Sequence, residues 1–202
     1  MSEGGERIVL LSRRGLATLL AAATVLLAGC TTGTDAVDVT NGGQFRFVSA
    51  TPSGELIAPD DRGSAPAFGG TLLDGAEFDS SSLSGSVAVL NFWGQWCAPC
   101  RVETPQFQQV YDDVAGQGVE FLGINVKDND QQARAFLADN DVTFPSLFDP
   151  RGEMALIFRD YPPSAIPSTI LLDRDGDVAA VYLAAVDPDD LRAALDTLLA
   201  ER

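Results

Sequence analysis

The chain contains no histidine among its 202 residues. No other side chain supplies a base near neutral pH unless its pKa is shifted, so this absence excludes Ser-His and Cys-His catalysis, most catalytic zinc sites and histidine-ligated haem. Basic residues are also scarce, with 13 Lys+Arg against 29 Asp+Glu and a formal net charge of −16. Such a charge repels nucleic acid, and we expect no nucleic-acid partner. Any proton transfer must therefore involve a carboxylate, a thiol or water.

The first 29 residues have the pattern of a lipoprotein signal peptide. Arg13 and Arg14 precede an uncharged stretch, residues 15–29, that is rich in Leu and Ala, as in the n-region and h-region of an export signal. The two arginines are compatible with general secretion and with the twin-arginine route. The stretch is shorter than the roughly 20 residues that a transmembrane helix needs, which disfavours a permanent membrane-spanning anchor.

The signal segment ends in "LLAGC", residues 26–30. This motif resembles the lipobox of bacterial lipoproteins, in which the cysteine sulfur receives a diacylglyceryl group and the cysteine becomes the new N-terminus. A buried thiol or a disulfide partner is the alternative for Cys30, but the residue lies between an apolar leader and a polar tract. We therefore expect a lipid anchor at Cys30.

The rest of the chain is long enough for one ordinary hydrophobic core. Residues 30–65 are rich in Thr, Gly, Asp, Ser and Pro, which predicts a lipidated flexible tether before a single domain at residues 66–202. The order strand, helix, strand, helix predicts parallel pairing and an α/β fold. The expected elements are a hairpin turning at Asp74-Gly75, strands at 87–93 and 119–126, helices after the cysteines and at 129–140, an antiparallel strand pair at 168–173 and 178–183, and a last helix capped by Asp187.

Two cysteines three positions apart, Cys97 and Cys100, lie in the stretch "GQWCAPCRVE". Such a pair can be half of a metal site, a structural disulfide or a redox dithiol. The two further soft or imidazole ligands that such a metal site needs are missing, since the only other cysteine is Cys30, the expected lipid anchor. A structural bridge across two residues closes too small a loop to stabilise much. We therefore interpret the pair as a redox dithiol. Cys97 lies where the strand passes into a helix, whose N-terminus stabilises a thiolate, so Cys97 is the expected nucleophile and Cys100 the resolving thiol.

The longer stretch "NFWGQWCAPCRVETP" resembles the active-site strand and helix of the thioredoxin superfamily, in particular its membrane-tethered TlpA/ResA-type thiol–disulfide oxidoreductases. The resemblance runs from about Pro66 to the C-terminus and includes Trp96, Pro99, Pro105 and a later "AIPST" motif. It implies a thioredoxin-like fold with a central mixed sheet flanked by helices. It also implies an N-terminal hairpin and an inserted helical segment, about residues 129–158, between the second and third core strands.

The resemblance further implies a substrate-binding surface around the dithiol. Pro167 corresponds to the cis-proline of the family, and a cis bond would turn the backbone so that Ile166 can pair with a substrate strand beside Cys97. An ordinary trans proline at the start of a strand is the alternative. Trp96 and Pro99 would contribute to the same surface.

Glu103 is the residue we expect to replace the missing histidine. Thioredoxin has a buried aspartate in the strand before its motif, whereas this chain has Asn91, which cannot take a proton. TlpA/ResA-type proteins carry a glutamate three residues after the second cysteine, where Glu103 stands. A partly buried carboxylate there could accept the proton of Cys100 as a general base. The alternative is a solvated glutamate that only complements the helix N-terminus.

Together these patterns predict an extracytoplasmic thiol–disulfide oxidoreductase, anchored through Cys30 at the outer face of the cytoplasmic membrane. We expect it to act as a monomer without cofactor or metal, to reduce exported proteins that carry cysteines, with apocytochrome c as an example, and to receive electrons from a membrane thiol carrier. The alternatives are net disulfide formation, a thiol peroxidase and a metal-binding module on the same fold. The peroxidase lacks its proline and threonine before Cys97, and the copper-binding module lacks its histidine.

Overall fold

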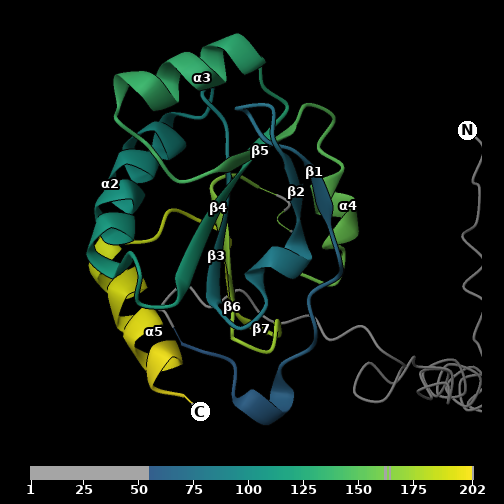
Figure 1. Cartoon of the computed structure of the whole chain (residues 1–202), viewed down its shortest axis with the longest axis vertical. Coiled ribbons are helices and arrows are strands. Elements are labelled where there is room, and N and C mark those ends of the chain that lie inside the picture. The colour runs from purple at the N-terminus through teal and green to yellow at the C-terminus, as the bar shows by residue number, and fades with distance from the viewer. Residues whose placement is uncertain (1–54, 162, 164, 202) are drawn as a thin grey trace, which may run out of the picture. The chain divides into compact units, whose positions relative to one another are not determined.

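The computed structural model of the chain describes residues 55–201, except Pro162 and Ser164 (Figure 1). The predicted signal peptide at 1–29, the lipidation of Cys30 and most of the predicted tether lie outside the described residues. Within the described part, no helix is long and apolar enough to span a membrane. The elements are η1 (Pro59–Asp61), β1 (Gly69–Thr71), β2 (Glu77–Asp79), η2 (Ser80–Leu83), β3 (Val87–Trp93), α2 (Ala98–Val114), β4 (Val119–Val126), α3 (Asp130–Asp139), β5 (Ser146–Asp149), α4 (Met154–Ile157), β6 (Ser168–Leu172), β7 (Val178–Tyr182) and α5 (Pro188–Ala200).

Five strands form one mixed sheet in the order β5-β4-β3-β6-β7. The central strand β3 pairs in parallel with β4 and antiparallel with β6. All seven residues of β3 are buried, because helices cover both of its faces. The predicted thioredoxin-like α/β fold with a mixed central sheet is therefore confirmed.

Successive side chains of β3 enter two different core layers. Val87 and Val89 pack with residues of α2 and α5, whereas Leu90 and Phe92 pack with Met154 and other residues of the α4 side. Figure 1 shows α2 and α5 on one side of the sheet, with α4, β1 and β2 on the other. The period of two along the strand thus decides which side chains can reach α2, the helix that follows the cysteines.

The segment predicted as an inserted helical stretch contains a strand as well as helices. Its first helix, α3, agrees with the prediction, and the Asn129 side chain caps it by accepting the Gln132 N–H. The strand β5 then pairs in parallel with β4 and completes one edge of the sheet. With only four residues, β5 is too short to show a periodic pattern in the sequence. The predicted hairpin at Asp74-Gly75 is confirmed, since β1 and β2 pair antiparallel across that turn.

The folded domain extends N-terminally of the predicted boundary at residue 66. Ile57 donates its N–H to the carbonyl of Ala179, and the carbonyl of Gly63 accepts the N–H of Val178, so both ends of residues 57–63 are bound at the start of β7. Residues 55–65, placed in the tether by composition, therefore include a packed part of the domain.

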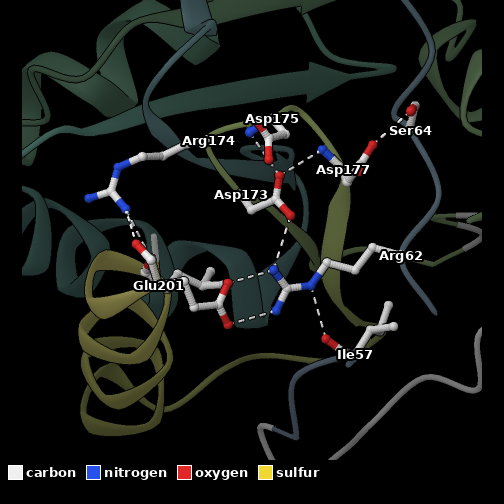
Figure 2. A network of polar contacts seen from close by, with 9 residues as sticks. Ile57, Arg62, Ser64, Asp173, Arg174, Asp175, Asp177 and Glu201 are labelled. Atoms are coloured by element: carbon white, nitrogen blue, oxygen red, sulfur yellow. Dashed lines mark hydrogen bonds and ion pairs between the residues drawn. The ribbon is translucent and has the colours of Figure 1, made fainter. Parts of the chain in front are cut away.

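Arg62 holds this N-terminal segment against the last helix (Figure 2). Its guanidinium makes two hydrogen bonds to Glu201, at 2.6 and 2.9 Å, and a third to Asp173 at 3.0 Å. Its Nε donates to the Ile57 carbonyl at 2.9 Å. The Arg62 side chain is only 2% exposed, and its hydrogen bonds lower the pKa of Glu201, so the pair remains ionised. One arginine thus joins the segment before β1, the β6–β7 turn and the end of α5.

We expect Arg62→Met to lower the free energy of unfolding by about 3 kcal/mol, because a buried ion pair loses one partner and the Ile57 carbonyl loses its donor. Arg62→Lys should give a smaller loss, since lysine keeps the charge but cannot bind both oxygens of Glu201 in one plane. Urea unfolding of the full chain measures both. Arg192→Met is the matched control, because Arg192 pairs with Asp113 at the surface, where solvent screens the pair and a much smaller loss is expected. Equal losses at the two arginines would contradict the role given to Arg62.

Candidate active site

The two predicted redox cysteines lie at the junction of β3 and α2. Cys97 is the N-cap of α2, and its Sγ accepts the backbone N–H of Cys100 at 3.3 Å. The two sulfurs form a disulfide in the structure. Cys97 is 5% exposed and Cys100 is fully buried. Only Cys97 can therefore meet another protein, and the N-terminus of α2 stabilises its thiolate when the disulfide is reduced.

Trp96 forms the exposed wall next to Cys97. Its side chain is 55% exposed, and its Nε1 donates to the Val126 carbonyl at 3.1 Å. A Cβ on Gly94 would come within 2.7 Å of this nitrogen, so the absence of a side chain at Gly94 lets the indole lie across the loop. This large apolar surface is fixed in place before any partner arrives.

Pro167 and Ile166 approach the dithiol from the start of β6. The Ile166–Pro167 peptide bond is cis, which agrees with the family resemblance rather than with an ordinary trans proline. The Ile166 side chain packs against the cluster that contains Cys97 and Cys100. Within the described part of the chain, the Ile166 backbone makes no hydrogen bond to another segment. Its polar groups are therefore available to an extended peptide.

Glu103 is buried behind the dithiol, one helical turn after Cys100. It is 1% exposed, accepts the Asn91 Nδ2 at 2.9 Å and accepts the Val186 N–H at 2.8 Å. Burial raises the pKa of the Glu103 carboxyl, and these two hydrogen bonds oppose the rise without cancelling it. The alternative of a solvated surface glutamate is therefore wrong.

The Asn91 amide lies between Glu103 and Thr169. Its Nδ2 also donates to the Thr169 hydroxyl at 3.2 Å, while its Oδ1 is buried without a partner. Rotation of the amide by half a turn would present Oδ1 to a protonated Glu103, because an amide carries donors on one side and acceptors on the other. An aspartate at this position would instead oppose the ionised form of Glu103.

Asp128 is a part of the site that the sequence did not indicate. Its carboxylate accepts the Gln95 N–H at 2.6 Å and the Asn125 Nδ2 at 2.9 Å. It thereby ties the loop before Cys97 to the end of β4. Asp128 stands more than thirty residues after Gln95 in the chain, and no local motif marks this contact.

The predicted site residues fall into three groups. Cys97, Cys100 and Ile166 meet at the disulfide, Trp96 and Pro167 adjoin them in the chain, and Glu103 lies buried one helical turn after Cys100. Pro99 lies exposed in the first turn of α2, and Cys30 is outside the described residues. Among the described residues, no group of three or more Cys, His, Asp or Glu side chains could hold a metal ion.

Comparison with known proteins agrees with this geometry. A family profile described as the AhpC/TSA family matches residues 62–181. "Thiol-disulfide oxidoreductase ResA" of Geobacillus kaustophilus is 31% identical over 134 residues, which are 66% of this chain and 75% of the relative. "Thiol:disulfide interchange protein HelX" of Rhodobacter capsulatus is 33% identical over 60% of this chain and 66% of its own length.

Solved structures show the same relationship. A secreted thiol-disulfide isomerase from Corynebacterium glutamicum superposes with a TM-score of 0.69 at 36% identity, over 75% of this chain and 96% of the other. A DsbF homologue from Corynebacterium diphtheriae gives a TM-score of 0.67 at 33% identity, over 73% and 96% of the two chains. The chain therefore belongs to the AhpC/TSA family within the thioredoxin-like fold, and it is a thiol–disulfide oxidoreductase that resembles ResA.

Proposed function

We propose that this protein reduces disulfides of other exported proteins from a lipid anchor at Cys30 on the outer face of the cytoplasmic membrane. The observation that carries the proposal is the arrangement around the dithiol: an accessible sulfur at a helix N-terminus, a buried second sulfur, and a buried carboxyl one turn behind it. Apocytochrome c is one candidate substrate. A thiol carrier in the membrane would supply the electrons.

The exchange proceeds in two steps that move two electrons to the substrate. The Cys97 thiolate attacks one sulfur of the substrate disulfide, whose S–S bond breaks, and the second substrate sulfur leaves as a thiolate and takes a proton. Cys100 then loses its proton to Glu103 and attacks the Cys97 sulfur. The mixed disulfide breaks, the Cys97–Cys100 disulfide forms, and the remaining substrate thiolate takes up the second proton. The dithiol of the carrier restores the reduced form by the reverse exchange.

The surroundings of the dithiol favour this direction over net disulfide formation. Strong oxidants of this fold stabilise their reduced, thiolate form. Here the residues between the cysteines, Ala98 and Pro99, carry no charge, and the chain has no histidine to pair with a thiolate. The ionised form of Glu103 disfavours a second negative charge on Cys100. The helix N-terminus is therefore the main group that stabilises the thiolate of the reduced form. With little other stabilisation, the dithiol gives up electrons readily.

We expect the reduction potential of the Cys97–Cys100 couple to lie below about −200 mV, nearer to that of thioredoxin (about −270 mV) than to that of a dedicated disulfide-forming protein (about −120 mV). Equilibration of the full chain with glutathione and dithiothreitol buffers, followed by alkylation of free thiols, measures this value. A potential near −120 mV would refute the reductive direction and support the disulfide-forming alternative.

Substitution of the resolving thiol should identify the partners. In Cys100→Ser, Cys97 can still attack a substrate, but the mixed disulfide can no longer be resolved, so covalent complexes should accumulate. Non-reducing electrophoresis and mass spectrometry of cells that express the variant detect these complexes. Cys97→Ser is the matched control and should trap no partner, because Cys100 is buried. Complexes at equal yield in both variants would contradict the assigned roles.

Glu103→Gln should slow the resolving step by about 10²-fold, the lower end of what a general base contributes, and should flatten its pH dependence. In the unchanged protein this step should accelerate as pH rises through the raised pKa of Glu103, because only the ionised carboxyl can accept the proton. Rapid-mixing measurement of the release of a peptide from its mixed disulfide with Cys97 gives the rate. Glu120→Gln, which alters an exposed carboxylate on β4, is the control and should leave the profile unchanged.

The same variant separates this role from a structural one. Because the folded state raises the pKa of Glu103, it binds a proton that the unfolded chain has already lost. Stability from the neutral carboxyl is therefore complete at pH values below the unfolded pKa and falls as pH rises through the folded pKa. Glu103→Gln should remove this fall. If Glu103→Gln removes this fall in stability but leaves the pH dependence of the resolving rate unchanged, Glu103 is not the base.

A further inference from the structure

A pocket of about 320 Å³ lies beside the dithiol. Trp96, the chain neighbour of Cys97, and Ile166, which packs against the cluster of the two cysteines, form two of its walls. The remaining lining is apolar or backbone, with the side chain of Lys127 as its sole charged group within the described part of the chain. A peptide that pairs with Ile166 would therefore place a neighbouring side chain in this pocket.

Lys127 is held in place by an unusual backbone conformation. Its φ angle is 51°, in the left-handed region that residues with a side chain rarely adopt. Its N–H donates to the Asp149 carbonyl at 3.0 Å, which fixes the turn after β4. The aliphatic stem crosses Gly152, where a Cβ would come within 2.8 Å of the lysine Cε. The aliphatic stem of Lys127 is thus held against Gly152, which also lines the pocket.

Lys127 is a cation in a chain whose net charge is −16. No ion pair of Lys127 exists within the described residues. The adjacent carboxylate, Asp128, is engaged by the Gln95 and Asn129 backbone N–H groups and by the Asn125 amide. The pocket therefore combines apolar walls with one cation that has no ion-pair partner among the described residues, in a chain of net charge −16.

We propose that this pocket is a specificity site for protein substrates, and that Lys127 selects those with an acidic residue next to the reacting cysteine and an apolar residue beyond it. This inference rests on the proposed exchange with protein disulfides. Trp96 and Ile166 would contact the apolar side chain, and the ammonium group would pair with the carboxylate. A basic residue at the same position would be repelled, so the pocket would both attract one class of substrate and exclude another.

The test uses three disulfide-bonded peptides that are identical except for Glu, Gln or Lys next to one cysteine, each followed by Leu. The measured quantity is the second-order rate constant for their reduction by the full chain in its dithiol form. We expect the Glu peptide to react roughly two- to fivefold faster than the Gln peptide, the range of an exposed ion pair, and the Lys peptide to react slowest. The preference should disappear in about 1 M salt.

Lys127→Gln should abolish the preference and Lys127→Glu should reverse it. Arg192→Gln changes the net charge equally, but Arg192 lies on α5 and pairs with Asp113, so the preference should persist. Equal rates for the three peptides, or a preference that survives Lys127→Gln, would overturn the inference. Hydroxyethyl disulfide, a small neutral substrate, should react equally with all variants and shows that the dithiol is intact. Failure to reduce any peptide while this small disulfide reacts would refute the proposed function itself.

Discussion

The site depends on one carboxyl group, Glu103, that is kept out of water between α2 and the sheet. Burial of an ionisable group is costly unless hydrogen-bond donors face it. Asn91 on β3 supplies one donor, and the backbone of Val186, just before α5, supplies another. Two consecutive elements, β3 and α2, and a segment 83 residues farther along therefore converge on one side chain. The donors only partly offset the effect of burial, so the pKa of Glu103 remains raised. The buried carboxyl can therefore bind a proton more readily than an exposed one.

The sequence alone was sufficient to predict the elements that carry this site. The apolar runs at 87–93 and 119–126 correspond to β3 and β4 without a shift of boundary, because strands buried on both faces leave continuous hydrophobic stretches. The position of Cys97 at a helix N-terminus followed from the change between two periodicities. The burial of Glu103 followed only from a family resemblance, since its partner Val186 lies 83 residues away.

Other features could not be predicted because their causes are tertiary. The segment before residue 66 is polar in composition, yet Arg62 and its hydrogen-bonded neighbours fix part of it to the domain. Composition gives only the average hydrophobicity of a segment. It does not detect a single buried arginine that is paired with carboxylates. Likewise, β5 has four residues and exists because β4 offers an open parallel edge. The hydrogen bonds of Asp128 and the left-handed backbone conformation of Lys127 both depend on the turn that follows β4.

The alternate residues of β3 that face α2 show how the core becomes an active site. Val87 and Val89, at the beginning of the strand, are part of the ordinary hydrophobic layer. Asn91 then places a polar amide in the same row, opposite Glu103. Trp93, at the end, packs in the cluster of Cys97 and Cys100. The row therefore runs from apolar packing, past the amide that faces the buried carboxyl of Glu103, to the tryptophan that packs against the redox pair. Because Asn91 on the central strand donates to Glu103, the carboxyl is tied to the middle of the sheet, and its displacement would break this buried hydrogen bond.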